Sequence, residues 1–191
     1  MKYYYLFAVL LCVAFSSCDG RKSHKESLEE SVTEFKDSIG PIENIKYFPE
    51  EYAETVTDTI LSNGYRVKLK TYTDMENSVL NEFKVDTIVH KHYYREFIAS
   101  IYIEKEGVEI SNLNIDKDFI IKNDESSDFY KSFYEDALLY SVWLSEYNST
   151  ISDKIIFIIS LCKPESDDCI MYETIIHYDG KVELNELEEY Y

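Results

Sequence analysis

The sequence is poor in glycine and in basic residues, and each shortage excludes a class of function. Only five glycines stand in 191 residues, and no glycine-rich phosphate-binding loop can be found among them. The chain has 19 Lys and Arg against 37 Asp and Glu, a formal net charge of −18. Because nucleic-acid binding depends on basic side chains that displace counterions from phosphates, we expect no nucleic-acid partner. A nucleophile elbow and a zinc-protease helix motif are also missing, so no motif points to catalysis.

Long hydrophobic runs are missing too, except for one at the start of the chain. It covers residues 3–15, which is too short for a membrane-spanning helix of about 20 residues but suits a secretory signal of about 7–15. We therefore predict a signal peptide over residues 1–17. Ser16 and Ser17 precede Cys18, which resembles the lipobox of bacterial lipoproteins, whose cysteine is acylated and becomes the first residue. We expect membrane anchoring through acyl chains on Cys18; the alternative is an ordinary signal peptide and a free thiol.

Cysteine is scarce, with four in the chain. Cys12 leaves with the predicted signal and Cys18 carries the lipid, so Cys162 and Cys169 remain for one disulfide in an oxidising compartment. This pairing sets the register of a β-hairpin with one largely apolar face, in which Leu161 lies opposite Ile170, Ile159 opposite Tyr172, Phe157 opposite Thr174 and Ile155 opposite Ile176. Two reduced thiols at strand ends are the alternative.

Most of the chain after residue 50 alternates polar and apolar residues, which predicts a mainly β protein. We expect an antiparallel β-sandwich or curved sheet of about nine short strands with two or three short helices. One longer strand should turn Phe97, Ala99, Ile101 and Ile103 inward. Residues 83–89 predict another, half-buried strand.

Asn63 and Gly64 suit a two-residue type I′ turn between two strands. In the hairpin that this turn produces, apolar residues share the inner face with Asp58, which lies opposite Leu69. Thr59 then lies on the polar outer face. An inward-facing carboxylate is a candidate catalytic group, but we interpret Asp58 as an edge-strand charge that deters aggregation.

A helix is predicted ahead of the strands. Leu28, Val32, Phe35 and Ile39 recur at helical spacing, Ser27 and Glu30 match a capping box, and residues 40–41 are Gly-Pro. We assign residues 18–50 to a lipid-anchored tether that carries this amphipathic helix, and residues 51–191 to a single β-rich domain. The apolar stripe either packs on that domain or binds a partner.

A set of segments between residues 58 and 184 carries a resemblance to a known family: Asp58-Thr59-Ile60, Gly64-Tyr65-Arg66-Val67, Asp116-Lys117-Asp118-Phe119, Asp128-Phe129-Tyr130-Lys131, Leu138-Leu139-Tyr140-Ser141-Val142, and residues 175–184. In these segments the sequence resembles small envelope lipoproteins of the Bacteroidales kind, a family defined only as a domain of unknown function. The resemblance implies an envelope location and a mostly β fold, and it implies no activity.

Secreted proteins of this bacterial kind are often O-glycosylated where Asp is followed by Ser or Thr and then by an apolar residue. The chain holds three such sites, centred on Ser38, Thr59 and Thr87. We predict modification at Ser38 or Thr59. Thr87 is excluded because it aligns with the apolar positions of the strand predicted at residues 83–89.

Two groups of polar residues contain possible metal ligands, and we interpret both groups as solvated surface. His90 and His92 share one face of a strand but have no third ligand in view. Acidic clusters at residues 116–128 and 165–168 lack the glycine and closing glutamate of a calcium loop. We therefore expect no metal and no cofactor.

Tyrosine is in excess, with 18 copies. Its flat amphipathic ring suits protein and sugar recognition, although strand tyrosines also serve cross-strand packing. The candidates for a binding patch are Tyr93, Tyr94, Tyr102, Tyr130, Tyr134 and Tyr140.

Together these patterns favour a non-enzymatic, lipid-anchored cell-envelope protein that binds an unknown protein or glycan. The alternative is an acidic inhibitor or immunity-type lipoprotein that neutralises a basic toxin or hydrolase by electrostatic attraction. We expect the outer membrane, on its periplasmic side, because the residues after Cys18 lack the acidic cluster associated with surface export; surface exposure is the other possibility.

Overall fold

The computed structural model describes residues 23–39 and 42–187. The predicted signal peptide and Cys18 lie outside them. The chain divides into two units, residues 1–42 and 43–191, and α2 (His24–Ile39) is the described helix of the first.

Ser23 and Glu26 cap α2, since the Ser23 amide donates to Glu26 Oε2 (2.8 Å) and the Glu26 amide to Ser23 Oγ (3.2 Å). The helix therefore begins one turn before the position predicted from Ser27 and Glu30. Its apolar residues Leu28, Val32 and Phe35 are exposed.

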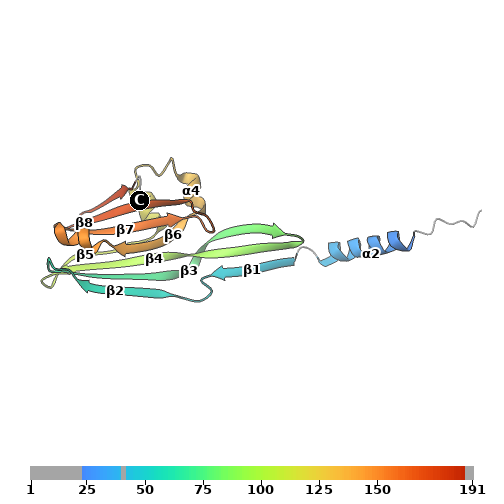
Figure 1. Ribbon diagram of the computed structural model, residues 1–191, viewed down its shortest axis with the longest axis horizontal. Coiled ribbons are helices and arrows are strands. Elements are labelled where there is room, and N and C mark those ends of the chain that lie inside the picture. The colour runs from blue at the N-terminus through green and yellow to red at the C-terminus, as the bar shows by residue number, and fades with distance from the viewer. Residues whose placement is uncertain (1–22, 40–41, 188–191) are drawn as a thin grey trace, which may run out of the picture. The chain divides into compact units, whose positions relative to one another are not determined.

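The second unit is mainly β, as predicted, with strands in two sheets rich in antiparallel pairs (Figure 1). The first sheet has the order β1-β4-β3-β2 with β5 also beside β4, and the second the order β6-β7-β8-β9. The strands are β1 (Ile42–Phe48), β2 (Glu54–Ile60), β3 (Tyr65–Val85), β4 (Ile88–Lys105), β5 (Val108–Ile115), β6 (Leu138–Leu144), β7 (Lys154–Cys162), β8 (Cys169–His177) and β9 (Val182–Glu186); the helices are α3 (Lys117–Asn123), α4 (Lys131–Asp136) and α5 (Glu146–Ile151). Because β1 belongs to the first sheet, the β-rich domain begins ahead of residue 51, the predicted boundary.

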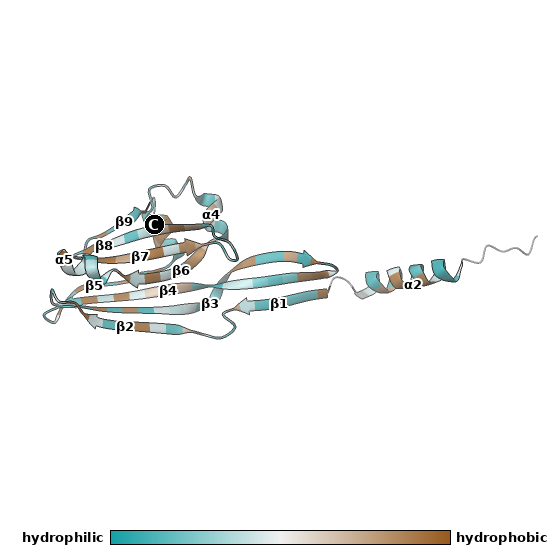
Figure 2. Ribbon diagram, in the orientation of Figure 1, coloured by the Kyte–Doolittle hydropathy of each residue, from teal (hydrophilic) through white to brown (hydrophobic). Residues whose placement is uncertain are grey.

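The two sheets pack face to face around one core, which makes the fold sandwich-like. Ala99, Ile101 and Ile103 of β4 are fully buried, which confirms their predicted inner face. Phe157 and Ile159 of β7 meet them from the second sheet. Strand β7 is buried on both faces along nearly its whole length, and Figure 2 shows it as an almost continuous hydrophobic strand.

The cysteine hairpin follows its prediction. Cys162 and Cys169 form a disulfide and pair directly across β7 and β8. The other predicted partners also lie opposite one another: Leu161 with Ile170, Ile159 with Tyr172, Phe157 with Thr174 and Ile155 with Ile176.

The predicted register between β2 and β3 is wrong by one residue. The Leu61 amide donates to the Tyr65 carbonyl (2.8 Å) and the Gly64 amide to the Leu61 carbonyl (2.9 Å), so the loop has three residues and not two. Gly64 adopts φ +87° in it, the left-handed position of a three-residue hairpin loop. The shift exchanges the faces of β2. Asp58 lies opposite Lys68 on the outer face and pairs there with Arg66 at 2.9 Å, and Thr59 turns inward opposite Val67.

Strands β3 and β4 form one long hairpin that extends past the second sheet (Figure 1). Its tip is a tight turn at Asp86 and Thr87, between paired Val85 and Ile88. The single strand predicted at residues 83–89 is therefore wrong, because Asp86 adopts φ +55° and reverses the chain. We call β1, residues 78–85 of β3 and residues 88–95 of β4 the arm.

An irregularity marks the point where the arm leaves the sandwich. Thr73 pairs with Phe97 and Ser78 with Arg95, so residues 74–77 of β3 lie opposite Glu96 alone. Such a bulge changes which face the following side chains take. Beyond it, β3 has no described strand on its outer side, because β2 pairs only with residues 66–72.

Candidate functional site

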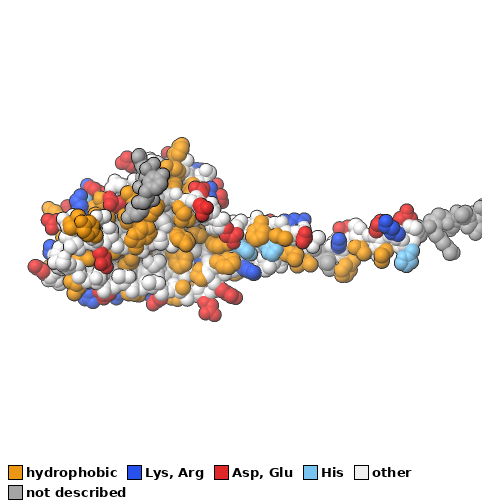
Figure 3. Space-filling view, in the orientation of Figure 1, with side chains coloured by type: hydrophobic (Ala, Val, Ile, Leu, Met, Phe, Trp, Pro, Cys, Tyr) orange, Lys and Arg blue, Asp and Glu red, His pale blue; other side chains and the backbone are white. Residues whose placement is uncertain are grey.

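An open groove of about 800 Å³ lies where the arm leaves the sandwich. More apolar than polar surface lines it. Figure 3 shows hydrophobic side chains and histidine gathered along the arm. The lining comes from the arm and β4 (Phe48, Pro49, Tyr94, Arg95, Phe97), from β6 (Leu138, Tyr140), from both cysteines and from residues 163–167.

Two irregularities of strand pairing lie at the groove. Tyr94 and Phe97, which both line the groove, flank Glu96, the residue of β4 that lies opposite the four residues 74–77 of β3. On β6, Leu139 pairs with Leu161 and Ser141 with Ser160, which leaves Tyr140 as an extra residue. Tyr140 is 68% exposed.

The rings on the groove side of the arm pack on one another. Phe48 stacks on Tyr94 with 5.1 Å between ring centroids and meets His92 edge-on at 5.2 Å. His92 is 9% exposed and also meets Phe83 edge-on at 5.0 Å. Because each ring restricts its neighbour, the aromatic floor of the groove is held in one arrangement.

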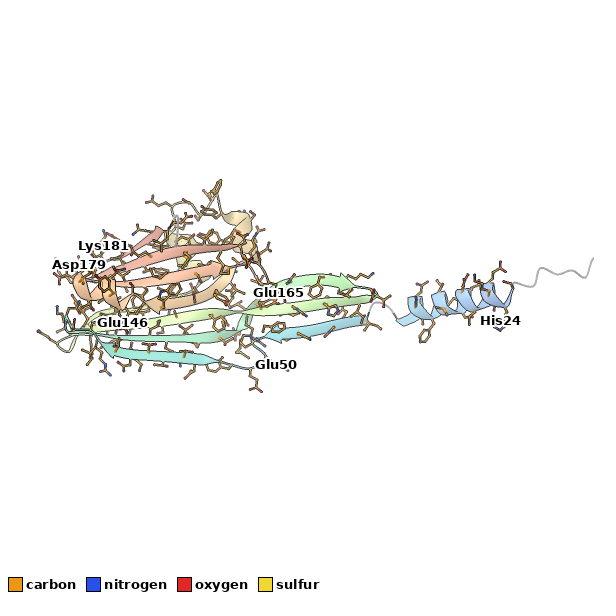
Figure 4. The ribbon with its side chains drawn as sticks, viewed as in Figure 1. His24, Glu50, Glu146, Glu165, Asp179 and Lys181 are labelled. Carbon is orange, nitrogen blue, oxygen red and sulfur yellow. A yellow bond between two sulfur atoms is a disulfide. The ribbon has the colours of Figure 1, made fainter. Side chains whose placement is uncertain are left out.

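The loop between the two cysteines forms the opposite wall. Glu165 adopts φ +54° in this loop, and its carboxylate accepts a hydrogen bond from the Tyr94 hydroxyl. The His92 Nδ1 atom lies 3.6 Å from Glu165 Oε1. Figure 4 places Glu165 between the second sheet and the start of the arm. The disulfide therefore holds a carboxylate at the groove.

These contacts shift two pKa values in opposite directions. The Tyr94 hydrogen bond, with help from His92, holds the pKa of Glu165 below its usual value. Burial and then the Glu165 carboxylate raise the pKa of Tyr94 to about 12. At neutral pH Glu165 is an anion and Tyr94 a neutral donor.

Both basic residues of the lining are already engaged. Lys163 Nζ lies 3.2 Å from Asp168 Oδ2. The Arg95 guanidinium donates to the carbonyls of Pro49 (3.2 Å) and Met75 (2.5 Å) and lies over the Tyr47 ring. Asp167 has no hydrogen-bond or ion-pair partner among the described residues. The groove therefore exposes carboxylates without a matching free cation of its own.

The structure brings together two of the six candidate tyrosines, Tyr94 and Tyr140. The others lie elsewhere. Tyr93 stacks on Tyr47 on the opposite face of the arm, and Tyr102 donates to Glu104 on the outer face of the first sheet. Tyr130 donates to Glu186. Sequence reasoning missed Phe48, Pro49 and Phe97 as part of a site, since only folding brings residue 48 beside residue 165.

Tyr134 is buried in the core. Its hydroxyl donates to Asp124 Oδ2 at 2.6 Å and lies 2.5 Å from the hydroxyl of Tyr172. Burial is the main cause that raises the pKa of both tyrosines. We assign this cluster to stability.

The candidate metal residues do not assemble. His90 stacks on Phe83 with a centroid distance of 5.0 Å, and its Nδ1 lies 3.4 Å from Asn44 Nδ2. Among the described residues, no three His, Cys, Asp or Glu side chains gather closely enough to hold a metal ion. In the first acidic cluster, Asp116 caps α3 by accepting from the Phe119 amide at 2.7 Å.

The structure reverses the accessibility expected for two of the three glycosylation motifs. Thr59 is half-buried, whereas Thr87 is exposed in the turn at the tip of the arm. The burial argument against Thr87 is therefore wrong. Ser38 is exposed on α2, where its hydroxyl donates to the Phe35 carbonyl at 2.7 Å. Modification at Ser38 or Thr59 stays a prediction.

Comparison with known proteins leaves the site to be interpreted from its geometry. The sequence matches no protein-family model, and a search of curated proteins finds none that is similar to it. Within residues 23–39 and 42–187, no helix is long and apolar enough to cross a membrane.

Proposed function

We propose that this protein is a non-enzymatic binding protein of the bacterial cell envelope, anchored by acyl chains on Cys18, and that the groove beside the disulfide holds its ligand. The observation that carries the proposal is Tyr140. A large aromatic side chain that is 68% exposed on a bulge, facing a groove lined by other rings, is typical of a recognition surface and unnecessary for packing.

Two further features support this proposal. The disulfide agrees with an oxidising compartment outside the cytosol. Among the described residues, the groove brings together no nucleophile and base in hydrogen-bond contact. Glu165, whose pKa is lowered, accepts a hydrogen bond from the neutral hydroxyl of Tyr94. A groove built in this way suits binding better than proton transfer.

The test uses two tyrosines of similar exposure. Tyr140→Ser removes a ring from the groove, and Tyr147→Ser removes a 76% exposed ring from α5, outside it. Full-length wild-type protein and both variants serve as bait for cross-linking in native envelopes, and mass spectrometry identifies the bound molecules. We expect a partner that wild type and Tyr147→Ser retain and Tyr140→Ser loses. Equal recovery by all three would refute the groove as the binding site.

The anchor has its own test. Mature protein should carry the mass of acyl chains on Cys18, and Cys18→Ser should release the protein from the membrane fraction. A mature mass without lipid contradicts the anchor.

The net charge of −18 favours one second candidate, an acidic inhibitor or immunity-type lipoprotein. Capture driven by the whole surface should fall steeply with salt, because exposed charges are screened beyond about 8–10 Å at physiological ionic strength. A ligand held in the groove should lose affinity less steeply, because only the groove carboxylates, together with the aromatic rings, contribute to its binding. Partner recovery at low and high salt separates the two.

A further inference from the structure

We propose that the groove recognises a lysine or arginine side chain on an exposed segment of another protein. This inference rests on the binding function proposed above and adds the chemistry of the ligand.

The first argument is how this chain uses aromatic rings elsewhere. Four rings already hold a cation over the face: Tyr47 holds Arg95 at 4.7 Å, Tyr65 holds Lys105 at 4.3 Å, Tyr72 holds Lys70 at 5.5 Å and Phe133 holds Lys163 at 5.5 Å. No described cation lies over Phe48, Tyr94, Phe97 or Tyr140, the rings that line the groove. Phe48 and Tyr94 stack on each other, so each has one face covered, whereas the 68% exposed ring of Tyr140 offers an electron-rich face to a cation from outside.

The second argument is the charge left over in the groove. Lys163 is paired with Asp168, and Arg95 is bound to two carbonyls. Asp167 is unpaired among the described residues, and Glu165 is held as an anion by the Tyr94 hydroxyl. A carboxylate beside an aromatic face is the arrangement that binds an ammonium or guanidinium group, because one supplies charge and the other an apolar contact for the methylene stem.

The third argument concerns size. The groove is open and measures about 800 Å³, which is within the range of sites for whole small ligands and much larger than one side chain. A segment of chain that lies along the groove fills it, while the side chain supplies the positive charge. A neutral glycan would also stack on the rings, but it would leave the charge of Asp167 without a partner.

The experiment titrates hexalysine into the full-length protein and follows backbone and aromatic NMR signals. Hexaglutamate and a neutral glucose hexasaccharide are the comparison probes. We expect shifts at Tyr94 and Tyr140 with hexalysine alone. Tyr140→Ser should weaken binding about threefold to tenfold, as expected for the loss of a cation–aromatic contact.

Charge is tested with two double variants of equal net charge. Glu165→Gln with Asp167→Asn removes the groove carboxylates, and Glu106→Gln with Asp153→Asn removes two exposed carboxylates that line a different pocket. We expect the first pair to weaken binding about tenfold or more and the second to change it little. Since Asp167 has no described partner, Asp167→Asn alone tests the effect without disturbing the Tyr94 contact.

Three outcomes would overturn the inference. If both double variants weaken hexalysine binding equally, this binding depends on the overall charge of the protein and not on the groove. Binding of the hexasaccharide at Tyr94 and Tyr140, without hexalysine, means that the groove recognises a glycan, and the proposed binding function then stands while this inference fails. Absence of any shift at the groove rejects the cationic ligand, and the Tyr140 cross-linking result decides the binding function independently.

Discussion

Tyr134 illustrates how a single hydroxyl can matter in this core. It is 4% exposed, and its hydroxyl links the Asp124 carboxylate with Tyr172, which is fully buried. A buried hydroxyl is tolerated only when it is hydrogen-bonded. Asp124, Tyr134 and the more distant Tyr172 therefore satisfy one another's hydrogen bonds.

The raised pKa values of Tyr134 and Tyr172 predict how stability changes with pH. Tyrosine ordinarily ionises near pH 10. Because the folded-state pKa is higher than the unfolded one, the stabilisation is complete below pH 10 and is lost as the pH rises further. Ultraviolet titration of the folded protein should show a group of phenols that ionise late, together with falling stability.

Tyr134→Phe provides the matched variant. It should remove one late phenol and lower the free energy of unfolding by about 1–3 kcal/mol at neutral pH, because the buried hydrogen bonds to Asp124 and Tyr172 are both lost. Tyr140→Phe, which alters an exposed hydroxyl, is the control in the same urea titration. Equal stability of the two variants would contradict the role given to the cluster.

At the scale of elements, the disulfide hairpin is the best predicted part of the fold. The cysteines fix a register, and every pair of residues predicted from that register is present between β7 and β8. Strand β2 had no such constraint. Its register follows from a three-residue loop, in which the Asn63 side chain donates to the carbonyls of Ser149 (2.7 Å) and Ser152 (3.3 Å). Local sequence cannot reveal a contact with α5, about 86 residues away in the chain.

The groove was not predictable for a related reason. Its tyrosines stood among the candidates, but bulges decide which of them face it. Neither the unequal pairing around Glu96 nor the extra residue at Tyr140 leaves a signal in the alternation of polar and apolar residues. The arm was missed because the turn at Asp86 and Thr87 has no glycine to mark it.

The disulfide should stabilise the hairpin that it closes. Replacing both cysteines by alanine should lower the free energy of unfolding by about 2–3 kcal/mol, the chain-entropy value for so short a loop. Urea denaturation measures the loss. Reductant should reproduce it in wild type and have no effect on the double variant; identical wild-type midpoints with and without reductant would argue against the bond.

At the scale of the whole second unit, the two parts of the β3–β4 hairpin differ in how they are buried. Residues 99–103 of β4 lie under the second sheet, with Ala99, Ile101 and Ile103 fully buried. On the arm, Leu80 and Val85 are 44% and 51% exposed. The β3–β4 hairpin therefore runs from a two-layered region into a region that is largely one layer.

Hydrogen exchange should follow that division. Amides of residues 80–93 that pair within the arm should exchange faster than those of residues 99–103, because opening the arm exposes less apolar surface. Mass spectrometry of peptides from each half of β4 measures the difference. Uniform protection along β4 would mean that the arm opens only when the whole domain unfolds.

In the membrane-anchored form that we propose, the open side of β3 in the arm has a consequence for neighbouring copies. Copies anchored to one membrane would meet far more often than copies in solution, and an unpaired strand is a template for another strand. Residues 80–85 carry Leu80, Phe83 and Val85, but also Glu82 and Lys84, both exposed. Such charges on an edge strand hinder edge-to-edge pairing with the strand of another molecule. Glu82 and Lys84 therefore oppose the pairing of one arm with another.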